Sequence, residues 1–139
     1  MKKNFKIQIK AMVFNLDRFL VIKPSKSWEF PEGKVRFGET LERATINRIK
    51  DLTGLDIEVL KPLYTNTIIK NNKVHTLVIT LLCFSKNNKI NLKDKSYEYK
   101  WIKSYELEKY LSEELLNDIE MNLDMDKILL DMKFFYFYK

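Results

Sequence analysis

Short runs of alternating polar and hydrophobic residues dominate the first hundred positions, a pattern typical of strands. The first two runs are separated by a turn at 15–18 and predict a hairpin. The run at 74–84 is almost wholly apolar, so we expect it in the middle of a sheet. The predicted strands are 5–14, 19–22, 57–60, 64–69, 74–84 and 97–102.

Helical spacing of apolar residues appears first at 41–53, which holds neither Gly nor Pro. Thr40 is suited to cap the start of this helix, and Gly54 followed by Leu55 is a typical stop signal. Residues 104–111 and 112–132 are also predicted to be helical, followed by an aromatic tail at 134–138. Between strand and helix, residues 27–38 contain two of the three glycines and one of the three prolines, so we expect a shaped loop.

This order of elements predicts a mixed α/β or α+β fold in which strands come first and helices last. The 139 residues are a usual length for one domain, so residues 1–139 are predicted to form a single unit with an acidic helical segment at 104–139. No apolar run is long enough for a transmembrane helix or a signal peptide, which favours the cytoplasm. The single cysteine, Cys83, cannot form an internal disulfide, and with one histidine, His75, a Cys/His zinc site is excluded.

Charge is distributed unevenly within the overall +6. Residues 1–103 carry 21 basic and 10 acidic side chains, whereas residues 104–139 carry 4 basic and 9 acidic side chains. A basic body attracts polyanions, either nucleotide phosphates or nucleic acid. No stripe of interleaved arginines and aromatics is present, which argues against nucleic acid and for a phosphorylated small molecule.

The chemistry is concentrated in residues 28–40, which read WEFPEGKVRFGET, and in the helix that follows. Gly33, Glu39, Ile49, Gly54 and Leu55 match in spacing a motif of Gly, five residues, Glu, seven residues, then Arg-Glu-aliphatic-any-Glu-Glu-any-Gly-aliphatic. With these residues the sequence resembles the Nudix (MutT-like) hydrolase family, and the similarity extends to the opening hairpin and to the strand near Trp101. The resemblance implies an α/β/α sandwich around a mixed sheet with the motif as loop–helix–loop. It also implies hydrolysis of a pyrophosphate bond in a nucleoside di- or triphosphate with Mg²⁺ or Mn²⁺.

The motif departs from the family at its charged positions. The family's arginine corresponds to Asn47, and its three glutamates correspond to Arg48, Asp51 and Leu52. These three lie on one face of the predicted helix because they are spaced by three and four residues. Mg²⁺ requires oxygen ligands, which neither Arg48 nor Leu52 offers. The expected consequence is impaired catalysis.

Candidate site residues follow from the resemblance and from the carboxylates that remain. For several of them a purely structural role stays open. Arg48 can be a solvated helix residue paired with Glu42 or Asp51, and Glu98 can be a cross-strand partner of a lysine. Trp28 can be a partly buried residue that only supports the fold. The candidate catalytic residues are Asp51, Glu98 and Glu39; the candidate weak metal ligands are Asp51, Glu39, Glu98 and Glu32; the candidate substrate contacts are Lys23, Lys34, Arg48 and Trp28.

Three functions remain open, and whether the chain is an enzyme is left undecided. One is a slow Mg²⁺-dependent (or Mn²⁺-dependent) pyrophosphohydrolase. Another is a non-catalytic nucleotide-binding or sensory domain that needs no cofactor and uses basic side chains in place of the metal. The last is a protein-interaction module, for which a homodimer through the aromatic tail is one form.

Overall fold

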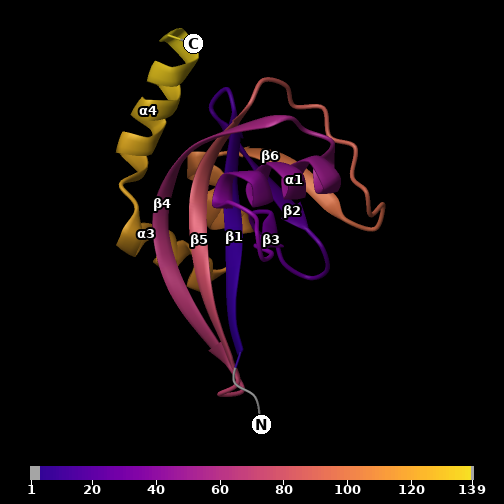
Figure 1. The fold of residues 1–139 in the computed structure, drawn as a ribbon. Coiled ribbons are helices and arrows are strands. Elements are labelled where there is room, and N and C mark those ends of the chain that lie inside the picture. Colours follow the sequence, from indigo (N-terminus) through magenta and orange to yellow (C-terminus); the bar gives the residue numbers. More distant parts are fainter. Residues whose placement is uncertain (1–3, 139) are drawn as a thin grey trace.

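A computed structural model describes residues 4–138, and their side chains up to residue 136. The strands form one mixed sheet in the order β4-β5-β1-β2-β6, with β3 paired to β1, and β1 runs parallel to β5 (Figure 1). The elements are β1 (Asn4–Asn15), β2 (Arg18–Lys23), β3 (Glu32–Lys34), α1 (Leu41–Thr53), β4 (Ile57–Lys70), β5 (Val74–Ser85), β6 (Glu98–Lys103), the 3₁₀ turn η1 (Ser104–Glu106), α2 (Leu107–Tyr110), α3 (Glu113–Asn122) and α4 (Met125–Tyr138).

The central strand β1 divides the core into two layers because its side chains alternate between the faces of the sheet. On one face, Ile9, Ala11 and Val13 are fully buried in a cluster with Ile49 of α1. Helix α1 therefore covers this face (Figure 1).

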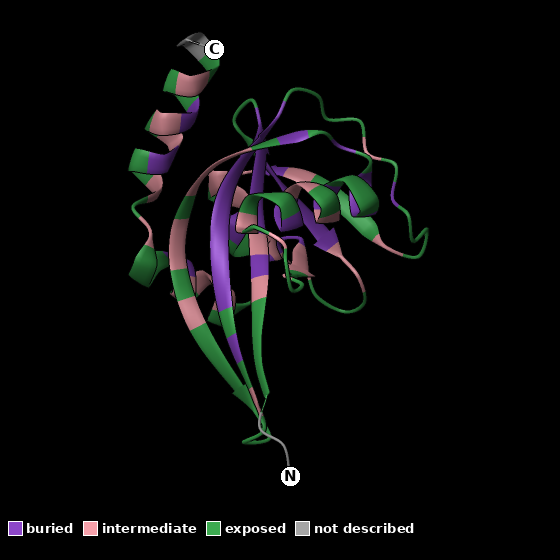
Figure 2. Cartoon of the chain, in the orientation of Figure 1, coloured by how far each residue is buried: buried purple, intermediate pink, exposed green. Residues whose placement is uncertain are grey.

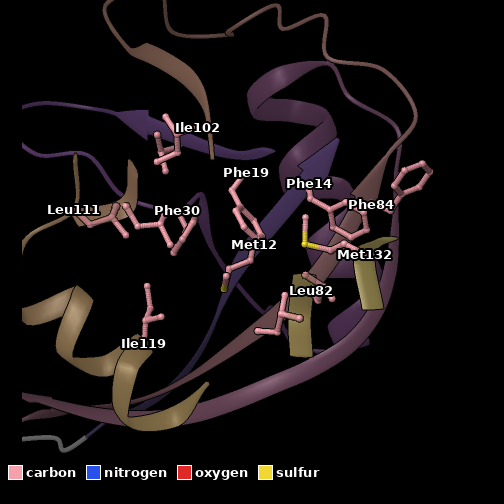
Figure 3. Close-up of a cluster of buried hydrophobic side chains, with 13 residues drawn as sticks. Met12, Phe14, Phe19, Phe30, Leu82, Phe84, Ile102, Leu111, Ile119 and Met132 are labelled. Atoms are coloured by element: carbon pink, nitrogen blue, oxygen red, sulfur yellow. The ribbon is translucent and has the colours of Figure 1, made fainter. Parts of the chain in front are cut away.

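The opposite face is covered by the C-terminal helices. Met12 and Phe14 of β1 lie here with Leu111, Ile119 and Met132 in a second buried cluster (Figure 3). Helices on both faces of a mixed sheet make the α/β/α sandwich that the resemblance implies. None of the helices in residues 4–138 is long and apolar enough to cross a membrane.

Strand β4 differs from the prediction of two separate strands at 57–60 and 64–69. It is continuous from Ile57 to Lys70 despite Pro62, with irregularities in register between Val59 and Lys61 and between Pro62 and Tyr64. Because β4 is an edge strand, a residue without a backbone N–H can be accommodated there at a bulge.

Two other expectations are corrected. The shaped loop contains a short strand, β3, paired with β1. The helix expected at 112–132 is two helices, because Asp124 accepts a hydrogen bond from the backbone N–H of Lys127 and begins α4.

The predicted aromatic tail is part of α4 and docks on its own chain as far as its side chains are described. Phe135 packs edge-on against Phe84, with ring centroids 4.7 Å apart, and lies 6.2 Å from Phe14. The side chains of Phe137 and Tyr138 lie outside the described residues. Cys83 is fully buried, and burial raises its pKa to about 12, so its thiol stays protonated near neutral pH.

Candidate functional site

The loop between β3 and α1 is held by its own residues. Glu39 accepts a hydrogen bond from the backbone N–H of Arg36 (2.8 Å), and Gly38 takes a positive φ of 88° that suits glycine. Thr40 caps α1 by accepting from the N–H of Arg43 (3.0 Å). Gly54 ends the helix at φ 78°. The predicted cap and stop of this helix are confirmed.

A cleft of about 700 Å³ opens beside this loop and α1. Its lining mixes both signs of charge, with cationic side chains and carboxylates both present on the loop and helix. It is lined by Gln8, Ile22, Pro24, Glu29, Glu32, Gly33, Lys34, Arg36, Glu39, Ala44, Asn47, Arg48, Asp51 and Tyr97.

Arg48 connects helix α1 to strand β3. Its Nε donates a hydrogen bond to the backbone carbonyl of Glu32 (2.6 Å). Its aliphatic stem lies against Gly33, where a Cβ would come within 2.6 Å of the Arg48 Cγ. Gly33 is therefore required for close approach, and the Arg48 side chain is fixed at the wall of the cleft. Among residues 4–138, neither Nη group of Arg48 has a hydrogen-bond partner within the protein.

Asp51 is paired with a lysine from a distant loop. The Nζ of Lys93 lies 3.1 and 3.3 Å from its two carboxylate oxygens. The backbone N–H of Lys93 also donates to the carbonyl of Leu52 (3.1 Å), which fixes this lysine beside the end of α1. The carboxylate predicted as a metal ligand is thus partly neutralised by an internal ammonium group.

Glu32 faces two partners on β1. Its Oε2 accepts a hydrogen bond from the side-chain amide of Gln8, and its Oε1 lies 3.8 Å from the Nζ of Lys10. Asp51, Glu39 and Glu32, three of the four predicted metal ligands, therefore line one cleft, but each is bound to a different group.

Glu98, Lys23 and Trp28 are not among the residues that line the cleft. Lys23 and Glu98 face each other across β2 and β6, with Nζ and a carboxylate oxygen 3.9 Å apart. Glu98 is thus a cross-strand partner of a lysine. The Trp28 ring packs edge-on to Tyr110, and the Nζ of Lys23 lies 5.7 Å from its centroid.

Solved structures share the fold of this chain. A MutT Nudix hydrolase from Burkholderia pseudomallei superposes with a TM-score of 0.72 at 20% identity, covering 88% of this chain and 100% of that chain. A Nudix-family hydrolase from Clostridium perfringens gives a TM-score of 0.70 at 14% identity, covering 86% and 96%. The MutT protein of Methanosarcina mazei gives a TM-score of 0.66 at 18% identity, covering 81% of this chain and 88% of that chain. The chain has the Nudix fold. No protein-family model matches the sequence.

A divalent metal, which the resemblance to Nudix hydrolases implies, does not fit the residues present. Among residues 4–138, no group of three His, Cys, Asp or Glu side chains is placed to hold a metal ion. Arg48 and Leu52 stand at two motif positions where the family resemblance places glutamates, and Leu52 is buried. At an effective dielectric of about 20, two unit charges about 4 Å apart interact by about 4 kcal/mol, so a guanidinium opposes a divalent ion strongly.

We therefore expect Mg²⁺ alone to leave the unfolding temperature unchanged. A ligand that binds only the folded state stabilises it by RT ln(1 + [L]/Kd). Without oxygen ligands the Kd for Mg²⁺ is far above about 1 mM, so this stabilisation is close to zero. Differential scanning fluorimetry with Mg²⁺ or with EDTA should give superimposable curves. A micromolar Mg²⁺ site in isothermal titration of the free protein would contradict this expectation.

Glu29 also lines the cleft, although no motif in the sequence points to it. It is half-buried, and burial raises the pKa of its carboxyl above the usual value; the nearby Glu32 carboxylate adds to this rise, while Lys10 opposes it. The signal in the sequence was its place next to the buried Phe30 and three residues before Glu32. Its charged form is disfavoured in the folded state.

Replacing Glu29 with glutamine should stabilise the protein at neutral pH. The pKa of Glu29 is higher in the folded state than in the unfolded state. Its contribution to the free energy of unfolding is therefore complete below the unfolded-state pKa and is lost as the pH rises through the folded-state pKa. Glu29→Gln removes that loss, so its unfolding temperature should exceed the parent's at pH 7.5 and approach it at pH 4. Thermal melts across this range test it, with the exposed Glu42→Gln as control. Equal gains at both pH values would show that ionisation of Glu29 is not the cause.

Proposed function

We propose that the chain binds a nucleotide or another phosphorylated small molecule in the cleft between β3 and α1, without metal-dependent hydrolysis. The observation that carries this proposal is the separate pairing of the carboxylates beside a fixed arginine. Lys93 pairs with Asp51, and Gln8 and Lys10 face Glu32. The Nudix fold supports a site for a pyrophosphate-containing ligand, and the donor set supports binding over catalysis.

The cationic side chains of the cleft can neutralise and orient a bound phosphate, as a metal ion would. Arg48 retains its two Nη groups as donors after its Nε is used by Glu32. A guanidinium binds two phosphate oxygens at once, and a fixed side chain loses little conformational entropy on binding. Lys34 and Arg36 are exposed at the same cleft and add charge without a fixed geometry.

The test is isothermal titration with ADP and ATP in EDTA, beside a phosphate-release assay with Mg²⁺ and Mn²⁺. We expect binding in EDTA and no release in either metal. Hydrogen bonds to charged groups contribute about 1.5–3 kcal/mol, so Arg48→Gln should weaken binding by about tenfold or more. Arg43→Gln is the matched control, since Arg43 is exposed on the same helix and is not among the residues that line the cleft.

Two results would contradict the proposal. One is metal-dependent release of phosphate or pyrophosphate by the parent protein, which would support the pyrophosphohydrolase instead. The other is the absence of binding by any nucleotide, sugar phosphate or inorganic pyrophosphate, which would favour the interaction module. Equal effects of the Arg48 and Arg43 variants would remove Arg48 from the binding site.

A further inference from the structure

A second cavity lies between helix α4, the turn that joins β1 to β2, and the 3₁₀ turn η1. Its volume is about 630 Å³, within the range of about 300–1,000 Å³ that is usual for small-molecule sites. Among the described residues, none lines both this cavity and the cleft beside α1. The two are therefore separate sites, and we call this one the α4 cavity.

One stripe of α4 forms a wall of the α4 cavity. Leu129, Met132, Lys133 and Tyr136 all line it, and their spacing places them on one face of the helix. Buried, half-buried and exposed positions alternate along α4 (Figure 2), and this stripe runs from the core to solvent, since Met132 is 2% exposed and Tyr136 is 47% exposed. The apolar surface and the ammonium group of Lys133 thus belong to the same face of the helix.

The facing wall comes from the two turns. Leu16 of the β1–β2 turn and Tyr105 of η1 line the cavity and are 50% and 75% exposed. Leu16 also has a positive φ of 56°, a conformation that is costly for a residue with a Cβ and that hairpin turns usually give to Gly or Asn. Packing in the core does not account for a half-exposed leucine at such a position, whereas contact with a ligand in the cavity does.

The charged groups of the α4 cavity favour an anion. Lys103 and Lys133 line it, and among the described lining residues Asp17 is the one carboxylate. The Nζ of Lys103 lies 3.7 Å from Oδ2 of Asp17, which neutralises that pair. The exposed ammonium group of Lys133 has no ion pair or hydrogen bond with the described side chains, which end at residue 136. One cation is therefore left to receive a negative charge.

We propose that the α4 cavity binds a small aromatic carboxylate. Tyr105 and Tyr136 can pack against an aromatic ring edge-on or offset, and the thioether of Met132 makes favourable contacts with such a ring. Lys133, on the same helical stripe, pairs with the carboxylate. The proposal is independent of the ligand of the cleft.

Isothermal titration with naphthylacetate, beside the neutral naphthylacetamide, tests the class of ligand. The acid should bind the parent protein at least about tenfold more tightly than the amide, because only the acid pairs with Lys133. Lys133→Gln should remove this difference and leave the affinity for the amide unchanged. Lys127→Gln is the matched control, since Lys127 is exposed on the same helix and does not line the cavity.

Leu16→Asn separates a ligand contact from a structural role. Asn tolerates a positive φ better than Leu, so the unfolding temperature of the variant should equal or exceed the parent's. The affinity for naphthylacetate should nevertheless fall about fivefold or more, because an apolar contact is lost. A residue needed only by the fold would show the reverse, a loss of stability with unchanged affinity.

Methionine methyl resonances locate the bound ligand. The signal of Met132 should shift on titration with naphthylacetate, whereas that of Met121, which is 84% exposed on α3 and does not line the cavity, should stay in place. Saturating ADP should leave the affinity for naphthylacetate unchanged. The proposal is overturned by absence of binding, by equal affinities for acid and amide, by tighter binding of decanoate than of naphthylacetate, or by a Leu16→Asn variant that loses stability but keeps its affinity.

Discussion

Leu52→Glu should destabilise the protein by several kcal/mol, although it restores one glutamate of the Nudix motif. Leu52 is only 3% exposed, so the new carboxylate would be buried. An unpaired buried charge costs several kcal/mol or takes up a proton. Burial raises the pKa of such a carboxyl, so the variant should lose further stability as the pH rises through that value.

Urea unfolding at pH 5 and pH 8 measures this effect. Leu52→Met is the matched control, because a swap that conserves volume and polarity usually costs less than about 1.5 kcal/mol. If Leu52→Glu retained the parent's stability at pH 8, position 52 would be able to hold a charge at the cleft. The motif could then be rebuilt together with Asn47→Arg and Arg48→Glu, and the metal-free interpretation would lose the support that the burial of Leu52 gives it.

The sequence alone leaves the hydrolase, the nucleotide-binding domain and the interaction module open. The spacing of the motif brings Gly33, Glu39, Arg48 and Asp51 to one cleft, since loop and helix are contiguous in the chain. The partners that decide the chemistry come from elsewhere. Lys93 reaches Asp51 from a loop 42 residues later in the chain, and no local pattern signals that contact.

The fold, too, was predictable where its signals are local and not where it depends on contacts between distant segments. Helix α1 was predicted with its cap and stop because both signals are local. Strand β3 was missed because three residues are too few for an alternating pattern, and only pairing with β1 defines them. Two strands were predicted at 57–60 and 64–69 where β4 is continuous, because the sheet edge accommodates Pro62. Tertiary contacts supplied what local propensity could not.

The contact between Gly33 and Arg48 is the second feature with a large expected effect. Gly33→Ala should destabilise the protein by about 1–3 kcal/mol, the usual cost of overpacking. The added Cβ would lie 2.6 Å from Cγ, 3.0 Å from Cβ and 3.1 Å from Cδ of Arg48. All three atoms are close to the helix backbone, so the arginine cannot yield without losing its hydrogen bond to Glu32.

A double-mutant cycle isolates this contact. Arg48→Ala removes Cγ and Cδ and leaves only the 3.0 Å approach, so Gly33→Ala should cost less in that background, with a coupling of about 1–2 kcal/mol from urea unfolding. Gly38→Ala is the control: Gly38 has a positive φ of 88° but no atom within 4 Å of an added Cβ, so its cost should add to that of Arg48→Ala within about 0.5 kcal/mol. Nucleotide affinity should fall in Gly33→Ala as it does in Arg48→Gln, because the displaced guanidinium no longer lines the cleft. If the destabilisations caused by Gly33→Ala and Arg48→Ala were additive, Gly33 would be required only by the backbone around β3. Arg48 would then not be held in place by its contact with Gly33.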